Sequence, residues 1–306
     1  MVTVVGEALV DLIAGPDGRA FTAHPGGSPA NVALGLVRLG LPARLGSRIG
    51  DDLFGRLVRD HLVADGVEVH ALPARTGQTS VAFAAMDANG VATYDFRLEW
   101  DVTDLSALPV DNHLHTGSLA TLLDPGAAVV EDAMRRARAA GATVSLDPNV
   151  RPSLAGEHGP ALARVERQVA AADVVKVSDE DLAWLYPGGD PREVARRWAA
   201  AGPALVVVTL GPDGALAVSG DSEAARPGPA VTVVDTVGAG DAFTAGLLRW
   251  LHAAGRLGAM SRLDAAELAA ALDFANTVAA RTCARPGADP PRPDDLADVW
   301  DLLPHI

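Results

Sequence analysis

The sequence is poor in cysteine, lysine and aromatic residues. Its 306 residues include a single cysteine, a single lysine and only 4% aromatic residues. A disulfide needs two cysteines, so Cys283 cannot form one within the chain, and we expect a small, half-buried helix residue there. This composition favours a reducing compartment and predicts a cytoplasmic protein.

The segments typical of secreted and membrane proteins are also missing. No uninterrupted apolar run approaches the roughly 20 residues that a membrane-spanning helix needs. The chain opens with an apolar run at residues 2–5 and has no basic region before it, unlike a secretory signal. We therefore expect a soluble protein with no membrane partner.

Positive charge is scarce as well. With 39 acidic and 25 basic residues, the formal net charge is −14. Nucleic acids and anionic membranes bind proteins through basic surfaces, so this charge argues against both as main partners. An anionic ligand would need a locally positive pocket. The length and the 49% hydrophobic content suit one large α/β domain or two small ones.

Strand-like and helix-like patterns alternate along most of the chain. The alternation predicts an α/β fold with a largely parallel central sheet flanked by helices on both faces. Strands are predicted at residues 2–5, 44–49, 113–116, 143–147, 174–177, 205–210 and 231–234. Helices are predicted at residues 31–39, 51–64, 125–140, 161–171 and 191–200, from about 240 to 251, and briefly after the Pro-rich run 286–293.

Several of these strands end in glycine or polar residues. Because open α/β sheets bind ligands beyond the carboxyl ends of their strands, we expect these ends to line one crevice. The strand-end segments are Gly6-Glu7, Gly117-Ser118, Asp147-Pro148-Asn149, Ser178-Asp179 and Gly211-Pro212.

One region breaks the alternation. Two β-rich runs, at residues 79–86 and 91–96, are separated by a predicted hairpin turn at residues 87–90, which contains Asn-Gly. A second turn is predicted at residues 15–18. We expect small β-rich insertions at about 12–23 and 77–98 that form either a lid over the crevice or a dimerisation flap.

The segment DTVGAGD at residues 235–241 predicts a turn of small residues and then a helix. The first amides of a helix lack partners within it, and glycines let a phosphate approach, so the segment indicates an anion site beside Asp241. An ordinary helix start is the alternative. A dinucleotide-binding fingerprint would need glycine at Phe243, and a Walker A loop needs a Gly-Lys pair, whereas the only lysine is Lys176.

A second glycine-containing segment, GGSPAN at residues 26–31, precedes a predicted helix. Gly26 and Gly27 would allow a ligand to approach the backbone, and Asn31 can donate and accept hydrogen bonds toward hydroxyls. Together with Asp11, this segment is suited to binding the vicinal hydroxyls of a sugar. Taken singly, it could equally be a turn with a helix cap.

These segments resemble those of the ribokinase-like (PfkB) family of sugar kinases, and within it most closely the fructokinases. Residues 26–31 resemble the family's N-terminal signature and residues 235–241 its C-terminal signature. Further similar segments follow in the expected order: DPNVR at 147–151, KVSDE at 176–180, TLGPDG at 209–214 and CARPGA at 283–288. The resemblance therefore extends over nearly the whole chain and implies a single ribokinase-like kinase domain at residues 1–306.

The resemblance implies a role for each segment. Asp241 would be the general base for the attacking hydroxyl, while the amides around Gly238, Ala239 and Gly240 would hold the transferring γ-phosphoryl group. The sugar would be bound by Asp11, Gly26, Gly27, Asn31, Arg97 and Arg151. ATP would be bound by Lys176, Ser178, Thr209, Gly211, Gly214 and Asn276.

The same resemblance implies cations. Relatives often carry Asn-x-x-Glu where this chain has Ser178 and Asp181, so we expect Asp181 or Glu180 to organise Mg²⁺ through water. Asp235 would lie near a K⁺ site. The two arginines have alternatives: Arg151 could clamp phosphate, and either could be a solvated surface charge.

The sequence thus predicts an ATP-dependent kinase that phosphorylates a primary hydroxyl of D-fructose, with a sugar and ATP as its small-molecule partners. Within the family, 2-keto-3-deoxygluconate kinase is the first alternative, followed by ribokinase and nucleoside kinase. A non-catalytic sugar or nucleotide sensor on the same fold is an alternative from another class, and a nucleotide-binding oxidoreductase is a third. Similar proteins suggest a homodimer formed through the lid.

Overall fold

Strands and helices alternate along the computed structural model of the chain, which describes residues 1–15, 17–86 and 92–304. The strands are β1 (Val2–Val5), β2 (Leu9–Ala14), β3 (Phe21–Gly26), β4 (Ala43–Ser47), β5 (Glu68–Ala71), β6 (Ser80–Met86), β7 (Ala92–Arg97), β8 (His113–Gly117), β9 (Thr143–Asp147), β10 (Val174–Ser178), β11 (Leu205–Thr209), β12 (Ala215–Ser219) and β13 (Ser222–Arg226). The helices are α1 (Ser28–Arg38), α2 (Leu53–Ala64), α3 (Leu119–Leu122), α4 (Gly126–Ala139), α5 (His158–Ala170), α6 (Asp179–Leu185), α7 (Pro191–Ala201), α8 (Ala239–Ala253) and α9 (Ala265–Cys283), with 3₁₀ turns η1 (Gly211–Asp213), η2 (Pro293–Leu296) and η3 (Trp300–Leu302).

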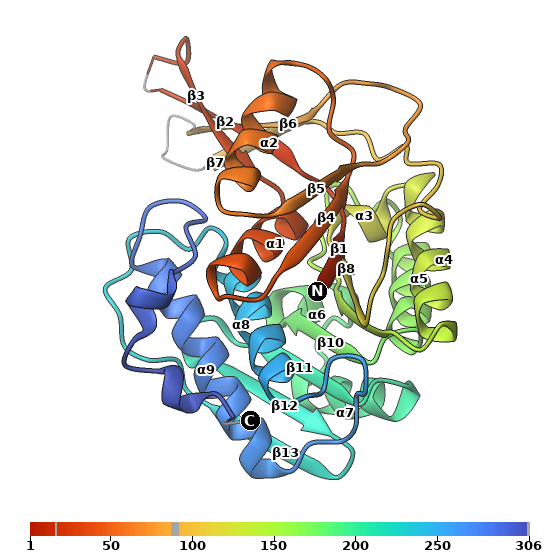
Figure 1. Cartoon of the computed structure of the whole chain (residues 1–306), viewed down its shortest axis with the longest axis vertical. Coiled ribbons are helices and arrows are strands. Elements are labelled where there is room, and N and C mark those ends of the chain that lie inside the picture. The colour runs from red at the N-terminus through yellow and green to blue at the C-terminus, as the bar shows by residue number, and fades with distance from the viewer. Residues whose placement is uncertain (16, 87–91, 305–306) are drawn as a thin grey trace.

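The main sheet has nine strands in the order β13-β12-β11-β10-β9-β8-β1-β4-β5. Every neighbouring pair from β5 to β11 is parallel, and β12 and β13 are antiparallel additions at one edge. Figure 1 shows helices on both faces of this sheet, so the predicted fold class is confirmed. No helix within the described ranges is long and apolar enough to cross a membrane.

The side chains of the central strands alternate between two cores. On β11, Leu205 and Val207 join the core beneath α1, α8 and α9, whereas Val206 and Val208 join the core on the opposite face, which includes residues of α4, α5 and α7. Successive residues of a strand point to opposite faces. A strand covered by helices on both sides is therefore apolar throughout, which explains the unbroken LVVV run of β11.

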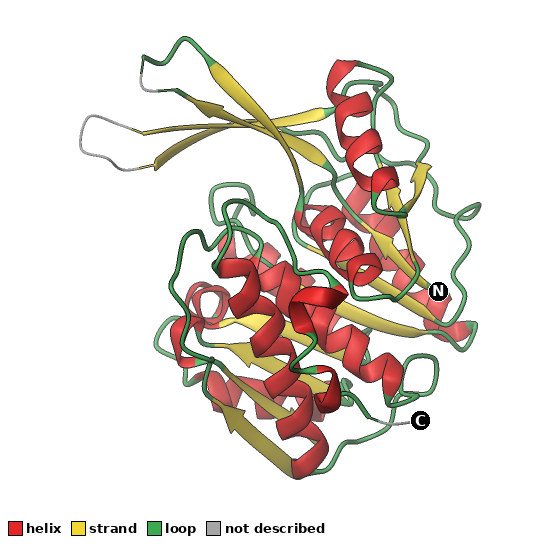
Figure 2. Ribbon diagram, turned by 60° about the vertical axis from the view of Figure 1, so that its left-hand side comes forward, coloured by secondary structure: helices red, strands yellow, loops and turns green. Residues whose placement is uncertain are grey.

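A second sheet, in the order β3-β2-β6-β7, projects from the body of the molecule (Figure 2). β6 pairs antiparallel with β7 and parallel with β2, so the predicted hairpin runs are confirmed as neighbouring strands. The turn predicted at residues 87–90 lies outside the described residues, as does Pro16 of the turn predicted at residues 15–18.

Most of the other predicted strands and helices are confirmed, and one predicted strand is wrong. The six strands predicted before residue 211 and the helices predicted up to residue 251 are present, with their bounds shifted by a few residues. The strand predicted at 231–234 is wrong: these residues are irregular, Val233 and Val234 are 58% and 59% exposed, and the Val234 amide donates to Cys283 O at the end of α9. Three valines in four residues suggested a strand, but no strand in the described part of the chain pairs with this segment.

Some elements were missed or were assigned the wrong type. β12 and β13, which form the antiparallel edge of the main sheet, were not predicted: β12 (ALAVS) is buried but contains a single β-branched residue, and β13 (SEAAR) is partly exposed and contains none. The short helix expected after the Pro-rich run is instead the pair of 3₁₀ turns η2 and η3.

Two histidines are buried within the main sheet. His113 Nδ1 lies 2.7 Å from Thr143 Oγ1, and His113 Nε2 and His115 Nδ1 each lie 2.8 Å from Ser145 Oγ. Burial lowers the pKa of each histidine from 6.5 to about 3, and for His115 the charge of Lys176 acts in the same direction. Both imidazoles are therefore neutral in the folded protein at neutral pH.

This burial predicts that acid destabilises the fold. Between pH 6.5 and 3 the unfolded chain binds a proton at each of these histidines and the folded chain does not, so the free energy of unfolding falls as the pH falls. Replacing His113 with Asn should remove about 2 kcal/mol of the change between pH 7 and pH 5, as measured by urea unfolding.

Other groups change the stability with the opposite sign: the raised pKa of Glu7 makes its contribution to the free energy of unfolding fall as the pH rises. These contributions are present in both proteins, so subtracting the wild-type curve from that of the variant removes them. Gln168→Leu, at a buried position whose side chain does not titrate, is the matched control and should leave the pH dependence unchanged. An identical pH dependence in wild type and His113→Asn would contradict the assignment.

Candidate active site

Asp241, in the first turn of α8, accepts hydrogen bonds from two residues of α1. Ser28 Oγ donates to Asp241 Oδ1 at 2.6 Å, and Asn31 Nδ2 donates to Asp241 Oδ2 at 2.8 Å. The Asp241 side chain is buried, and each carboxylate oxygen is held by a different donor. The structure therefore joins the two glycine-containing segments of the sequence around one carboxylate.

Close packing of α1 against α8 makes this contact possible. A Cβ atom on Gly35 of α1 would lie 2.7 Å from Ala245 Cβ of α8, closer than real side chains approach. The absence of a side chain at Gly35 lets the two helix backbones come together. Ser28 and Asn31, one turn apart at the start of α1, then reach the first turn of α8.

Backbone amides at the start of α8 are suited to binding an anion. Gly238, the residue before the helix, has a left-handed φ of 76°, and a Cβ there would meet Ala288 Cβ at 2.6 Å. The Ala242 amide donates to Gly238 O, an i to i−4 hydrogen bond in the first turn of α8. The N–H groups of Gly240 and Asp241 come before this bond in the chain. Such amides, with the positive end of the helix dipole, attract phosphate oxygens.

A buried ion pair lies beneath this helix start. Lys176 Nζ, from β10, is 3.0 Å from Asp147 Oδ2 at the end of β9, and the two side chains are only 7% and 2% exposed. A Cβ on Gly240 would lie 3.0 Å from Lys176 Nζ, which places the only lysine of the chain next to the anion site. Among the described residues, Asp147 Oδ1 is buried without a hydrogen-bond partner.

Several carboxylates surround this single ammonium group. Burial lowers the pKa of Lys176, but pairing with Asp147 and the nearby charges of Asp181 and Asp241 outweigh burial, so its pKa is raised and it stays charged. Burial raises the pKa of Glu7 to about 7, and the Asp241 charge adds to this, while hydrogen bonds from Ser118 and backbone amides oppose it. One buried positive charge thus lies next to the start of α8, with several carboxylates around it.

On the sugar side, Asp11 lies next to the paired glycines. A Cβ on Gly26 would lie 2.2 Å from Asp11 Oδ2, and a Cβ on Gly27, whose φ is 106°, would lie 2.5 Å from Glu7 O. A side chain at Gly27 would meet backbone, whereas at Gly26 the Asp11 carboxylate would have to move. Asp11 is half-buried, and burial raises its pKa while the charge of His24, its partner on β3, lowers it.

The two predicted sugar-binding arginines are exposed. Arg97, at the end of β7, donates from Nη1 to Asp95 Oδ1 at 2.9 Å, and Arg151 donates from Nη1 to Asn149 Oδ1 at 2.6 Å. Both side chains therefore bond near neighbours in the sequence and not the residues around Asp241. The charge of Arg151 nevertheless lowers the pKa of Asp147, so Arg151 lies near the buried ion pair.

Ser178 and Asp181 cap the start of α6. Ser178 Oγ accepts from the Asp181 amide at 3.0 Å, and Asp181 Oδ2 accepts from the Ser178 amide at 3.3 Å. Asp181 Oδ1 accepts from the Val150 amide at 2.8 Å, so both oxygens of this buried carboxylate already engage backbone. Glu180 is exposed. Within the described ranges, no group of three or more His, Cys, Asp or Glu side chains is arranged to hold a metal.

The other predicted nucleotide residues lie at the end of β11 and on α9. A Cβ on Gly214 would lie 2.1 Å from Arg226 O, and Asn276 Nδ2 donates to the same oxygen at 3.2 Å, so these two residues meet around one backbone segment. Thr209 Oγ1 lies 3.4 Å from Val177 O, and Gly211 is exposed with a φ of 55°.

Asp235 connects the turn before α8 to a loop near the C-terminus. Its Oδ1 accepts from the Val237 amide at 3.0 Å and its Oδ2 from the Gly287 amide at 2.8 Å. This contact joins segments that are 52 positions apart in the sequence. K⁺ binding near Asp235 stays a prediction.

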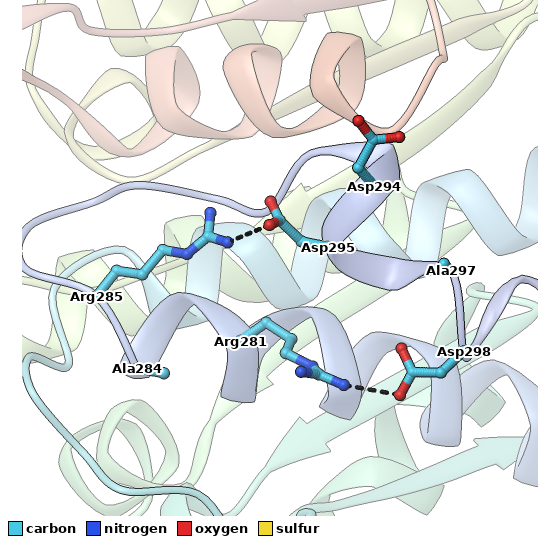
Figure 3. Close-up of a pocket in the computed structure, with 7 residues that line it drawn as sticks. All are labelled: Arg281, Ala284, Arg285, Asp294, Asp295, Ala297 and Asp298. Atoms are coloured by element: carbon cyan, nitrogen blue, oxygen red, sulfur yellow. Dashed lines mark hydrogen bonds and ion pairs between the residues drawn. The ribbon is translucent and has the colours of Figure 1, made fainter.

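A hollow of about 540 Å³ lies elsewhere, beside the end of α9 (Figure 3). It is crossed by the ion pairs Arg281 to Asp298 at 2.7 Å and Arg285 to Asp295 at 2.8 Å. None of the residues that line it was predicted to bind the sugar or the nucleotide, and we do not assign the active site to it.

Sequence reasoning missed three contributors to the site. Glu7 was noted only as a strand-end residue, Asp147 as a strand-end residue and as part of the DPNVR segment, and Ser28 only as part of the GGSPAN segment; none of the three was assigned a role. The signal for Glu7 and Asp147 was their position at the carboxyl ends of parallel strands. No feature of the sequence indicates that Ser28 bonds Asp241, because that contact depends on how two distant helices pack.

Comparisons with known proteins show which family and which structures the chain is similar to. A family model described as pfkB family carbohydrate kinase matches residues 1–295. A fructokinase from Rhizobium leguminosarum bv. trifolii is 36% identical over 258 residues, which covers 81% of this chain and 78% of that relative. The crystal structure of a fructokinase from Vibrio cholerae O395, with fructose, ADP and calcium ion bound, has a TM-score of 0.80 at 31% identity and covers 99% of this chain and 95% of that chain.

A structure named for another substrate is also similar. The crystal structure of aminoimidazole riboside kinase from Salmonella enterica, complexed with aminoimidazole riboside and an ATP analog, has a TM-score of 0.80 at 28% identity. It covers 97% of this chain and 99% of that chain. The same architecture therefore serves more than one acceptor.

The buried ion pair leads to a stability prediction. Lys176→Met leaves Asp147 buried without its cation and should lower the free energy of unfolding by about 3–5 kcal/mol, measured by urea unfolding at pH 7. The double variant Lys176→Met/Asp147→Leu removes both charges and should recover most of that loss. A loss below about 1 kcal/mol for the single variant would show that the pair is not buried as described.

Proposed function

The chain belongs to the pfkB family of carbohydrate kinases, and we propose that it transfers the γ-phosphoryl group of ATP to a primary hydroxyl of D-fructose. The observation that carries the proposal is the bonding of Asp241 to Ser28 and Asn31, which puts a carboxylate between the sugar-side helix and the anion site of α8. The similar proteins from Rhizobium and Vibrio, both named fructokinase, support fructose as the acceptor.

Asp241 is the proposed base. The carboxylate accepts the proton of the attacking hydroxyl as the new O–P bond forms and the bond between the γ-phosphorus and the β,γ-bridging oxygen breaks. The transition state of phosphoryl transfer is largely loose, so positioning and charge stabilisation supply most of the rate enhancement. Ser28 and Asn31 orient the carboxylate, and the amides of Gly238, Ala239, Gly240 and Asp241 hold the transferring group.

Lys176 would supply the positive charge of the site. Its ammonium lies beneath Gly240 and stays charged because Asp147 pairs with it. A fixed cation next to the helix start strengthens an anion site made of backbone amides. We assign Lys176 to the nucleotide phosphates and Asp147 to the positioning of Lys176.

The proposed sugar site joins the two sheets. Asp11, Gly26, Gly27 and Asn31 bind hydroxyls, and their support is the close approach of Asp11 to Gly26 beside α1. Arg97 and Arg151 are proposed to reach the ligand from the second sheet and from the segment after β9. Both are exposed, and their hydrogen bonds are with residues one or two positions away in the sequence, which a ligand can replace.

The remaining proposed roles concern the nucleotide and cations. Ser178, Thr209, Gly211, Gly214 and Asn276 are assigned to ATP. Mg²⁺ would neutralise phosphate charge, and because the oxygens of Asp181 already accept backbone amides, Asp181 and Glu180 would contact it through water. K⁺ is proposed near Asp235, whose carboxylate accepts hydrogen bonds from the turn before α8 and from the loop near the C-terminus.

The second sheet is proposed to act as a lid and as a dimer interface. Ile13 and Phe21 on its strands are 48% and 49% exposed, which is unusual for large apolar side chains. A lid would exclude water from the transfer step.

Substrate identity is tested by turnover with a panel of acceptors at equal concentration. A coupled ADP-release assay should give the highest kcat/KM for D-fructose, with 2-keto-3-deoxygluconate, ribose and aminoimidazole riboside well below it. The similar Salmonella structure makes the riboside the most informative competitor. Preference for any acceptor other than fructose would contradict the assignment, and no ADP release with any of them would favour a sensor.

The role of Asp241 is tested by Asp241→Asn. Loss of the base should lower kcat by about 10²- to 10⁴-fold, while the affinity for an ATP analogue, measured by calorimetry, stays within a fewfold of wild type. Glu193→Gln is the matched control, because Glu193 is also an acid in the first turn of a helix but has no proposed role. Unchanged turnover in Asp241→Asn would refute the mechanism.

A further inference from the structure

One arginine fixes the end of α1 that lies away from Asp241. Arg38 Nη1 donates to Asp289 Oδ1 at 2.5 Å and to Pro290 O at 2.9 Å, and its Nη2 donates to Asp65 Oδ2 at 2.9 Å. The Arg38 side chain is 7% exposed. One buried guanidinium therefore joins α1 to the end of α2 and to the loop at residues 284–292, which we call the C-terminal loop.

The C-terminal loop supports the anion site. The Gly287 amide donates to Asp235 Oδ2 at 2.8 Å, and Ala288 fills the space that a side chain on Gly238 would need. The turn that starts α8 is thus packed against this loop. A displacement of the loop would move the amides of residues 238–241.

Other ion pairs hold the same loop. Arg285 lies 2.8 Å from Asp295, as Figure 3 shows, and 3.6 Å from Asp289, while Arg292 lies 2.6 Å from Asp65. Asp289 is therefore shared by Arg285 from within the loop and Arg38 from α1. Of these contacts, only those of Arg38 connect the loop directly to the helix that carries Ser28 and Asn31.

We propose that Arg38 is a positioning residue that fixes the C-terminal loop to α1, so that the carboxylate of Asp241 and the anion site keep one relative geometry. Ser28 and Asn31 hold Asp241 from the start of α1, and Arg38 holds the support of Gly238 from its end. Errors of about 1 Å between reacting groups can lower rates by up to about 10²-fold. The inference rests on the proposed function for its catalytic consequence, but the placement of the loop is independent of the substrate.

The catalytic consequence is tested with Arg38→Met and Asp289→Asn. Each should lower kcat at saturating fructose and ATP about tenfold, with KM for fructose within about twofold of wild type, because Asp11, Gly26 and Gly27 are not displaced. Arg38→Lys should restore part of kcat. Arg164→Met is the matched control: Arg164 bonds one carbonyl, Leu122 O, and one carboxylate, that of Asp124, and neither partner lies in α1, in α8 or in the C-terminal loop.

Hydrogen–deuterium exchange of each variant without ligand separates this proposal from the proposed function. Peptides covering residues 236–241 and 284–290 should exchange at least about tenfold faster in Arg38→Met and Asp289→Asn, with no change in β9 and β10. That result supports the positioning role even if fructose proves to be the wrong acceptor. Wild-type exchange in both peptides, or equal acceleration throughout the chain, overturns it, as does wild-type kcat in both variants. If Arg38→Met does not fold, Asp289→Asn decides by the same criteria.

Discussion

The arrangement of the site depends on one contact, the hydrogen bonding of the Asp241 carboxylate by Ser28 and Asn31. The donors and the acceptor are more than 200 positions apart in the sequence. They meet because α1 lies directly against α8, an approach that the missing side chain at Gly35 allows. A carboxylate held by two donors has a fixed orientation, and the sugar side and the phosphate side of the site are built around it.

A second constraint is electrostatic. The chain carries a formal net charge of −14 and one lysine, yet the proposed reaction brings a highly charged anion to it. The structure meets this requirement with backbone amides at a helix start and with Lys176, which is buried beside Asp147. Neither depends on the overall charge of the surface, and the pairing with Asp147 keeps the ammonium charged in spite of its burial.

The fold and the family could be predicted from the sequence, and Asp241 could be proposed as the base, because these leave local signals: alternating apolar runs, glycines before helices and motifs in a recognisable order. Sequence reasoning missed contacts between distant segments. The pairing of Lys176 with Asp147, the bond from Ser28 and the contacts of Arg38 each depend on how elements pack, which no local pattern encodes. The wrong strand at residues 231–234 has the same origin, since a valine-rich run becomes a strand only where a partner strand is available.

The most direct test of the proposed transfer site is a crystal structure with D-fructose and a non-hydrolysable ATP analogue. A primary hydroxyl of the sugar should lie within about 2.6–3.2 Å of an Asp241 carboxylate oxygen. The terminal phosphate should accept hydrogen bonds from amides of residues 238–241. A sugar whose hydroxyls all lie away from Asp241, or a terminal phosphate bound elsewhere, would contradict it.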